Sequence, residues 1–414
     1  IHLLKRQREA LFRPLSPPSS LEPLTQFDSS GSLFNKERGR RLLSEGKVGC
    51  LLLAGGQGSR LKIQEPKGTL PVSLVKKKSL FQIFFEKTYA ASRFAGKALP
   101  LAIMTSPLNH AATLTFLEKN RWFGLDPKQC SLFLQGTLPY LDEKGDWVLE
   151  SPGVLAEGPD GNGGALTHFL ESGIWAKWKE SGVEYVNVIL VDNPLADPFD
   201  PELVGTHAQS LSEVTLKCVL RREENEKVGV LGTSEGRVRV VEYSELSEKE
   251  KSAKTAAGSL QWKVANTSLF CFSMEFIQRM VRGAHFFLPW HIAKKSAQVF
   301  KGLQKEEMQV WKCESYIFDL LNFAQKVKVL VYPREEIFAP LKNSAGENSL
   351  ATVQAALLAS DRRVYQEVTG VPPPDRKFEL DQAFYYPTAQ FLAKWKGRAL
   401  PDKEPDKEYI DGED

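Results

Sequence analysis

The sequence predicts an α/β protein in which a mostly parallel β-sheet carries helices on both faces. Two observations lead to this fold class. Short apolar runs of strand length alternate along the chain with segments whose apolar residues recur at helical spacing, a pattern typical of repeated strand–helix units. The run KVGCLLLAG (47–55) is also apolar along most of its length and contains glycines near both ends, as expected of a central parallel strand that is buried on both faces.

The elements before residue 47 are expected to be helical and peripheral. Residues 1–14 (IHLLKRQREALFRP) are basic and short of apolar length, so we expect a largely solvated helix. A connector rich in proline and serine follows at 14–23. A second, short helix is predicted within 35–47, with Asn35 as its N-terminal cap.

Strands and helices then alternate from residue 47 to about residue 345. The predicted strands are 47–55, 99–105, 130–135, 184–193, 214–220, 264–272 and 327–332. The predicted helices are 79–94, a segment from Pro107, 163–179, a segment from Pro201, and 314–325. Residues 228–243 (VGVLGTSEGRVRVVEY) instead predict a hairpin, because two apolar segments flank a turn that contains glycine.

The C-terminal part is expected to be small. One more helix is predicted from about Gly346, and the proline-rich VPPPD ends it. The last 13 residues carry seven acids and two lysines, so we expect them to be disordered or loosely attached. The predicted organisation is an N-terminal helical segment with linker (1–46), a central domain that carries the chemistry (47–345), a small C-terminal region (346–400) and an acidic tail (401–414).

Composition argues against several classes of function. Lys and Arg (54) nearly balance Asp and Glu (51), whereas a general nucleic-acid binder would show a strong basic excess. No apolar stretch approaches the ~20 residues that span a bilayer. The five cysteines are widely spaced and lack a CxxC pair, which argues against a disulfide frame or a zinc site and fits a reducing cytoplasm. We expect a cytoplasmic protein with no membrane partner, and favour a monomer.

The stretch LLLAGGQGSRLKIQEPKG (51–68) predicts a phosphate site. Gly55, Gly56 and Gly58 come directly after the first strand, where open α/β sheets bind ligands. Without side chains, such a loop can bring its N–H groups to phosphate oxygens, and Arg60 and Lys67 add positive charge. A tight turn with solvated cations is the alternative, but GG-x-G-x-R followed by P-K-G favours phosphate. The spacing matches neither a P-loop nor the dinucleotide GxGxxG.

The same stretch resembles the nucleotide loop of the UDP-sugar pyrophosphorylases, uridylyltransferases that pair UTP with a sugar 1-phosphate. Further similar segments follow in the order found in that family: FLQGTLP (133–139), GPDGNGGAL (158–166), EYVNVILVDNPLADP (184–198), VGVL (228–231), VVEYSEL (240–246), VANTSLFCF (264–272) and IFAPLKN (337–343). PDGNGG, VVEYSEL and LPWHIAKK (288–295) are most similar to the N-acetylhexosamine branch of the family.

The resemblance implies a Rossmann-like catalytic domain of the glycosyltransferase-A type with a reduced C-terminal region. It also implies Mg²⁺ as cofactor, and a sugar 1-phosphate oxygen that attacks the α-phosphorus of UTP in line while pyrophosphate leaves. Such chemistry needs positioning and charge neutralisation more than a proton-transfer residue. N-acetylglucosamine 1-phosphate is the substrate that the resemblance favours. The alternatives within the family are glucose 1-phosphate and a broad range of sugar 1-phosphates.

Residue roles follow from the same resemblance. Arg60 and Lys67 would hold the triphosphate, and Lys342 would reach a phosphate from the far wall. Asp192, at a strand end, would face Mg²⁺, which prefers carboxylate oxygen. The UTP-binding residues would be Ala54, Gly55, Gly56, Gly58, Ser59, Gln135, Gly161, Asn162 and Gly163. In the sugar pocket, Glu242 and Asn266 would form hydrogen bonds and Gly229 would make room.

Each of these residues also has an ordinary structural interpretation. Asp192 could cap the following helix, Glu242 could be a solvent-facing charge, and Gln135 could merely end a strand. Asn266 could be a satisfied polar residue in a strand and Lys342 part of a surface loop. The histidines, His168 and His291 among them, form no ligand pattern and are interpreted as structural.

The sequence departs from the family pattern at two places in the loop, and two other classes of function stay open. Ser59 stands where threonine is usual, and Lys62 stands where glycine is usual, so Lys62 could add a phosphate contact or obstruct the turn. A glycosyltransferase is disfavoured because the chain has no DxD motif. A non-catalytic nucleotide-sugar binding protein is disfavoured because Arg60, Lys67 and Asp192 are present.

Overall fold

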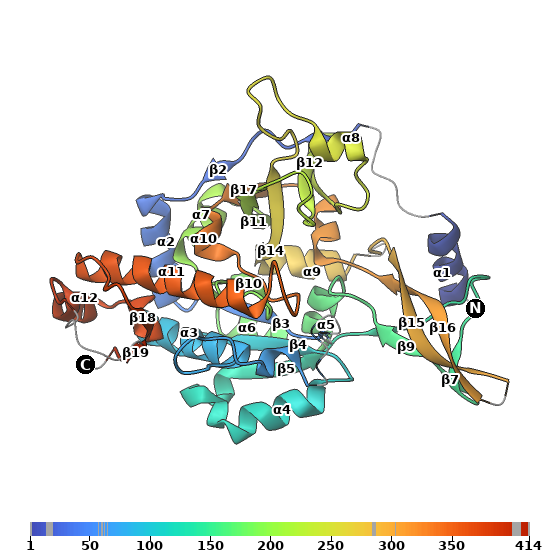
Figure 1. Ribbon diagram of the computed structural model, residues 1–414, viewed down its shortest axis with the longest axis horizontal. Helices are drawn as coiled ribbons and strands as arrows, with labels where there is room; N and C mark the ends of the chain where they lie inside the picture. Colours follow the sequence, from blue (N-terminus) through green and yellow to red (C-terminus); the bar gives the residue numbers. More distant parts are fainter. Residues whose placement is uncertain are drawn as a thin grey trace.

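The structure is a computed structural model of the 414-residue chain. It describes residues 2–13, 20–56, 58, 61, 63, 65–283, 287–302, 304–399 and 407–412. A central twisted sheet forms the body of the molecule (Figure 1), with the N-terminal helix and a long hairpin on one side and the C-terminal elements on the opposite side. No helix in these ranges combines the length and apolar content that a bilayer crossing requires.

The central sheet is mixed and mostly parallel, as predicted. Its main strands run in the order β2 (Asp28–Ser29), β17 (Val327–Val331), β11 (Val214–Leu220), β14 (Val264–Ser273), β10 (Tyr185–Leu190), β3 (Val48–Leu53), β4 (Leu101–Thr105) and β5 (Cys130–Leu134). All neighbours in this order pair in parallel except β14, which is antiparallel to both β10 and β11. The parallel strands therefore end at a common edge.

Two apolar cores lie on the two faces of the sheet, and alternate residues of β3 enter each of them. Cys50 and Leu52 belong to one core, whereas Leu51 and Leu53 belong to the other, as the two-residue period of a strand requires. Helices α2 (Leu33–Ser44), α3 (Leu80–Ala95), α4 (His110–Lys119) and α7 (Pro201–Ser210) cover the first face. Helices α5 (Ala165–Glu171), α6 (Ile174–Glu180) and α9 (Met274–Val281) cover the second.

Three local predictions need correction. The helix predicted over 163–179 is two helices, α5 and α6, which break at Gly173. Residues 314–325 contain the end of a strand and a 3₁₀ helix, η5 (Ile317–Asn322), instead of an α-helix. The cap of α2 is Ser32, whose Oγ accepts the N–H of Asn35 at 3.2 Å, so Asn35 lies inside the helix.

The predicted hairpin is present as β12 (Val230–Ser234) and β13 (Arg237–Val241). Its two turn residues, Glu235 and Gly236, both have positive φ angles of 51° and 74°, as in the type I′ turns whose twist suits a two-residue hairpin. β12 joins the main sheet through β14 and also pairs with β1 (Glu22–Pro23). The short helix α8 (Glu248–Ser252) follows.

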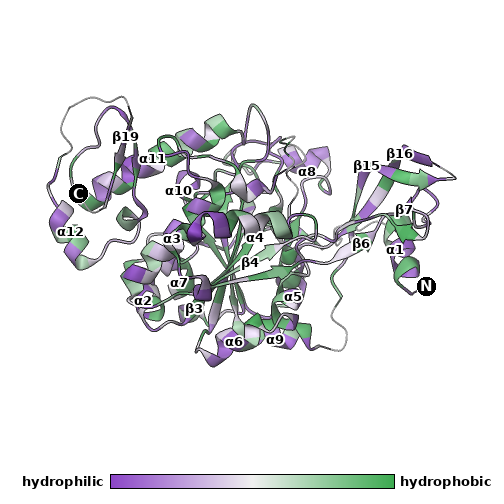
Figure 2. Ribbon diagram, turned by 90° about the horizontal axis from the view of Figure 1, so that it is seen from below, coloured by the Kyte–Doolittle hydropathy of each residue, from purple (hydrophilic) through white to green (hydrophobic). Residues whose placement is uncertain are grey.

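A second, longer hairpin, β15 (His291–Lys301) and β16 (Gln304–Glu314), was not predicted. It projects from the body beside α1 (His2–Phe12) and the strands β6 (Thr137–Pro139), β7 (Leu149–Ser151), β8 (Val154–Leu155) and β9 (Glu157–Pro159) (Figures 1 and 2). The prediction of a solvated first helix is wrong at Gln7, which is fully buried, donates to the carbonyl of Pro139 at 2.9 Å and accepts from Trp147 Nε1 at 2.7 Å.

The C-terminal elements form a small unit with its own apolar cluster. They are α11 (Leu350–Thr369), β18 (Lys377–Leu380), the 3₁₀ helix η6 (Gln382–Phe384), α12 (Ala389–Trp395) and β19 (Lys407–Ile410). The short helix α10 (Arg334–Ile337) precedes them and packs Ile337 into the first core of the body. The tail is not disordered at residues 407–412, because β19 pairs in parallel with β18 and Ile410 is buried in that cluster. Residues 401–406 and 413–414 lie outside the described part of the chain.

Candidate active site

The predicted phosphate and metal residues meet at the carboxyl edge of the sheet. β3 and β10 are parallel neighbours in which Leu53 pairs with Leu190, so the loops that follow them start side by side. The first loop leads to Lys67, the first residue of the 3₁₀ helix η2 (Lys67–Thr69), and the second leads to Asp192. Lys67 Nζ lies 3.6 Å from Asp192 Oδ2, and both side chains are largely buried, with 15% and 13% exposure.

The segment that carries Lys342 adjoins this pair. The N–H of Leu341 donates to the carbonyl of Asp192 at 2.8 Å, and Lys67 Nζ donates to the carbonyl of Leu341 at 3.3 Å. Asn193 fixes the same segment, because its side chain donates to the carbonyl of Ile337 at 2.7 Å and accepts from the N–H of Ala339 at 3.0 Å. Three chain segments that are far apart in sequence therefore meet in one corner at the carboxyl edge of the sheet.

The interpretation of Asp192 as a helix cap is wrong. Asp200 caps α7, since its Oδ1 accepts the N–H groups of Glu202 at 2.8 Å and Leu203 at 3.3 Å. The side chain of Asp192 faces Lys67 instead. In the described part of the chain no group of three or more Asp, Glu, His or Cys side chains forms a metal cage.

The glycine loop is described only in part. Arg60, Ser59 and Lys62 lie outside the described residues, so their roles stay predictions. Gly55 shows a close approach: a Cβ built on it would lie 1.6 Å from Gln135 Oε1, whereas one on Gly56 would meet nothing within 4 Å. The backbone of Ala54 is already used, because its N–H donates to Met104 at 2.7 Å and its carbonyl accepts from Asn109 Nδ2.

Gln135 does more than end β5. Its side chain lies over Gly55, and its Nε2 donates to the carbonyl of Gly161 at 3.3 Å. Gly161 has a φ of 90°, and a Cβ on it would lie 2.2 Å from the carbonyl oxygen of Ser315. Gln135 therefore connects the glycine loop to the GPDGNGG segment, as expected of two walls of one nucleotide pocket.

Asn162 and Gly163 lie beside the end of β16. The N–H of Gly163 donates to the carbonyl of Ser315 at 2.9 Å, and Asn162 Oδ1 accepts the N–H of Ile317 at 3.0 Å. The carboxamide oxygen of Asn162 thus holds the backbone at Ile317, a structural contact that the sequence did not predict. Ser315 was not among the predicted site residues.

Gly229, Glu242 and Asn266 come together as predicted. The N–H of Asn266 donates to the carbonyl of Gly229 at 2.8 Å, and a Cβ on Gly229 would lie 3.3 Å from Glu242 Oε1. Glu242 is partly buried, not solvent-facing: burial raises its pKa, Glu245 adds to the rise, and His291 and Lys342 oppose it. Lys342 is therefore close enough to Glu242 to link the predicted phosphate and sugar subsites.

Three residues of this pocket were not predicted. His291 Nε2 lies 3.0 Å from Asp319 Oδ2, and His291 Nδ1 lies 3.3 Å from Glu245 Oε1. Burial works against a charge on the imidazole, but the hydrogen bonds to Asp319 and Glu245 outweigh it and raise the pKa of His291 to about 9. The available signal was the position of His291 in LPWHIAKK, although its partners are distant in sequence.

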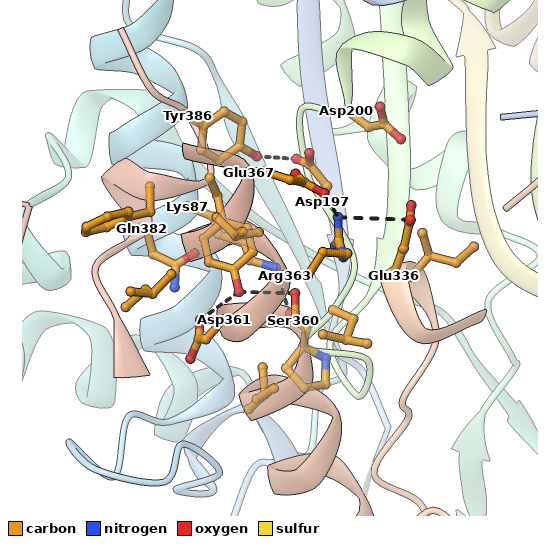
Figure 3. Close-up of a pocket in the computed structure, with 18 of the residues that line it drawn as sticks. Lys87, Asp197, Asp200, Glu336, Ser360, Asp361, Arg363, Glu367, Gln382 and Tyr386 are labelled. Carbon is orange, nitrogen blue, oxygen red and sulfur yellow. Dashed lines mark hydrogen bonds and ion pairs between the residues drawn. The ribbon is translucent and has the colours of Figure 1, made fainter. Parts of the chain in front are cut away.

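A separate cavity of about 550 Å³ lies between the body and the C-terminal elements. Figure 3 shows Tyr386 hydrogen-bonded to Asp197 in the upper part of the view, and Ser360 and Asp361 below them. None of the predicted site residues lines it. Lys87 Nζ donates to the carbonyls of Pro194 and Ala196 at 2.7 and 2.9 Å, so this region supports the loop after Asp192 from behind.

The chain is similar in sequence and in fold to known proteins. Residues 18–385 match the sequence profile of the family described as UTP--glucose-1-phosphate uridylyltransferase. The chain belongs to this family. Among curated relatives of the uridylyltransferase family, UDP-N-acetylglucosamine diphosphorylase 2 of Arabidopsis thaliana is 35% identical over 77% of this chain and 66% of that protein. UDP-N-acetylhexosamine pyrophosphorylase-like protein 1 of Homo sapiens is 32% identical over 87% of this chain and 76% of that protein.

Solved structures agree with the family assignment. The UDP-N-acetylglucosamine pyrophosphorylase of Trypanosoma brucei, in complex with an inhibitor, matches with a TM-score of 0.85 and 26% identity over 99% of this chain and 89% of that chain. A protein of Entamoeba histolytica described as the same kind of enzyme matches with a TM-score of 0.80 and 25% identity over 94% and 98%. The chain spans 66% of the Arabidopsis thaliana protein named above and 65% of a second one, UDP-N-acetylglucosamine diphosphorylase 1, which is just under two thirds of each.

Proposed function

We propose that this member of the uridylyltransferase family transfers a uridylyl group from UTP to a sugar 1-phosphate and releases pyrophosphate. The observation that carries the proposal is the corner formed by Lys67, Asp192 and the Leu341–Lys342 segment at the carboxyl edge of the sheet. The nucleotide walls at Gly55 and Gln135 adjoin it. A cation beside a carboxylate at this edge suits the transfer of a phosphoryl group between two anions.

Each side chain has a separate role in the proposed reaction. An oxygen of the sugar 1-phosphate attacks the α-phosphorus of UTP, and the bond to the leaving pyrophosphate breaks. Lys67, together with Arg60, would hold the triphosphate and stabilise its charge, while Lys342 would bind a phosphate from the opposite wall. Glu242 and Asn266 would orient the sugar by hydrogen bonds to its hydroxyl groups. Positioning of the two substrates is the main contribution of the chain.

Asp192 is suited to a magnesium ion that is shared with the substrate. Mg²⁺ in nucleotide sites takes one or two protein carboxylates and completes its shell with phosphate oxygens and water. Among the described side chains, the contact that the carboxylate of Asp192 makes is the 3.6 Å approach of Lys67, so its oxygens are suited to such sharing. When bound, the ion would neutralise negative charge on the phosphates.

N-acetylglucosamine 1-phosphate is the proposed sugar substrate. Several relatives of this chain carry names that refer to N-acetylglucosamine or N-acetylhexosamine, and PDGNGG, VVEYSEL and LPWHIAKK support the same branch. Glucose 1-phosphate is the alternative within the family. A non-catalytic nucleotide-sugar binding protein is the alternative of another class.

A panel of sugar 1-phosphates tests the proposal. The full chain is incubated with UTP, Mg²⁺ and either N-acetylglucosamine 1-phosphate, N-acetylgalactosamine 1-phosphate or glucose 1-phosphate, and pyrophosphate release is measured. We expect the highest kcat/KM with N-acetylglucosamine 1-phosphate. Turnover with glucose 1-phosphate alone would reassign the sugar, and tight UTP binding without turnover would replace the enzyme by a binding protein.

A further inference from the structure

His291 joins three chain segments that surround the predicted sugar pocket. It begins β15, and its two ring nitrogens contact Glu245 at 3.3 Å and Asp319 at 3.0 Å. Its ring also packs on Tyr316 and Phe318, with centroids 4.7 and 5.8 Å away. The imidazole is therefore held on both edges and on its face, and its side chain is only 14% exposed.

Glu245 connects His291 to the turn that carries Glu242. One oxygen of Glu245 faces His291, while the other, Oε2, accepts the backbone N–H of Glu242 at 3.2 Å. The N–H of Glu245 donates back to the carbonyl of Glu242 at 2.9 Å. The turn that presents Glu242 to the pocket is thus closed by a carboxylate that His291 holds in place.

Asp319, the second partner of His291, belongs to a segment that contacts the predicted nucleotide pocket. The N–H of Asp319 donates to the carbonyl of Tyr316 at 3.0 Å. Ile317, which follows Tyr316, donates its N–H to Asn162 Oδ1 at 3.0 Å. The same histidine therefore connects the turn of Glu242 with the segment that holds the GPDGNGG wall.

The charges around His291 favour its protonated form. Glu242, Glu245 and Asp319 are three carboxylates within interaction range of one another. His291 and Lys342 are the cations that oppose the rise in the pKa of Glu242, and Arg239 interacts with Asp319. Burial chiefly raises the pKa of the Tyr316 hydroxyl, and Glu314, Glu242, Asp319 and Glu245 add to the rise. Without the imidazolium, the carboxylates would repel one another and the turn would lose its anchor.

We propose that His291, held between Glu245 and Asp319, is a positioning residue that orients Glu242 for the sugar. The inference rests on the proposed function and deepens it, because it names what sets the geometry of sugar recognition. His291 acts through Glu242 and need not touch the substrate.

Steady-state kinetics of His291→Gln, Glu242→Gln and the double variant test this role. With N-acetylglucosamine 1-phosphate and UTP, His291→Gln is expected to raise the KM for the sugar phosphate about tenfold and to change the KM for UTP by less than about twofold. In the Glu242→Gln background the same change should alter the sugar KM by less than about twofold, because the two residues act as one unit. Lys179→Gln, which removes a cation from its exposed pair with Glu275 on the body, is the matched control and should leave both constants unchanged.

The outcomes separate the inference from the proposed function. A wild-type chain that turns over no sugar 1-phosphate overturns the proposed function before any variant is compared. An active wild type in which His291→Gln shifts both KM values equally, or in which the two substitutions are fully additive, overturns the positioning role. Should His291→Gln fail to fold by thermal melting, Glu245→Gln replaces it, with the same expected rise in the sugar KM and the same contradicting results.

Discussion

Two lysines contact the loop after β10, and their contacts differ. Lys67, at the carboxyl edge of the sheet, lies 3.6 Å from Asp192 Oδ2 and 3.3 Å from the carbonyl of Leu341. Lys87, on α3, donates to the carbonyls of Pro194 and Ala196 at 2.7 and 2.9 Å. The contacts of Lys67 are at the long limit of hydrogen-bond geometry, whereas those of Lys87 are close to ideal.

The difference indicates which cation is available to a substrate. The ammonium of Lys67 can turn toward a phosphate at the cost of two weak contacts, and a charged donor to phosphate forms a stronger bond than either. The ammonium of Lys87 is engaged by two backbone carbonyls, and burial lowers its pKa to about 8. Its place next to Asp197 and Tyr386 (Figure 3) makes it part of the support behind the site.

The same substitution at both lysines tests this contrast, and Lys67→Met should give the largest effect. We expect kcat to fall by about 10²- to 10³-fold, because a cation that stabilises the developing charge is removed. The free energy of unfolding should change by less than about 1 kcal/mol, since the ammonium of Lys67 is held only by long, weak polar interactions. Single-turnover rates and urea denaturation measure the two quantities, and an unchanged rate in a folded variant would contradict the role of Lys67.

Lys87→Met should give the reverse pattern. Two buried carbonyl oxygens would lose their donor, which costs about 2–4 kcal/mol of unfolding free energy. The kcat of the folded fraction should fall by less than about tenfold, because Lys87 supports the Asp192 loop without touching the substrate. Urea denaturation and active-site-normalised kinetics measure this. A stable variant with lost activity would show that the two lysines have been assigned the wrong way round.

Two adjacent glycines extend the contrast to the nucleotide wall. Gly55→Ala places a methyl group 1.6 Å from Gln135 Oε1, so Gln135 must move, whereas Gly56→Ala meets nothing within 4 Å in the described structure. We expect the KM for UTP to rise about tenfold in the first variant and less than about twofold in the second. Equal effects in both would mean that Gln135 does not shape the pocket.

The fold was largely predictable because its core strands carry their signal locally. β3 and the hairpin β12–β13 were found from an apolar run and from a glycine-containing turn. The hairpin β15–β16 was missed because its residues are mostly polar and, within its two described strands, only Val299, Val310 and Cys313 are buried. Its apolar support comes from Tyr140, Val148 and Ala156, far earlier in the chain, and no local pattern reveals such a partner.

The candidate site shows the same limit. Gly229, Glu242 and Asn266 lie together in the structure. Their proximity could be predicted because each belongs to a segment that resembles the family. The contact of His291 with Glu245 and Asp319 depends on three segments that meet only in the folded chain. A histidine beside a tryptophan gave no reason to expect two carboxylate partners.

His291, like Lys87, has close polar contacts, although it lies beside the predicted sugar pocket. Its titration gives the smallest predicted effect. Its pKa of about 9 lies above its ordinary value of 6.5, so its stabilising contribution is complete below pH 6.5 and is lost as the pH rises through about 9. We expect the free energy of unfolding to fall by on the order of 1–2 kcal/mol across this window, and the KM for the sugar phosphate to rise with it. Lys87, with its pKa of about 8, titrates in the same window in both proteins, so the contribution of His291 is the difference in each slope between wild type and His291→Gln, which lacks the imidazole. Urea denaturation and kinetics between pH 6 and 10 measure them, and equal slopes in wild type and variant would place the titration elsewhere.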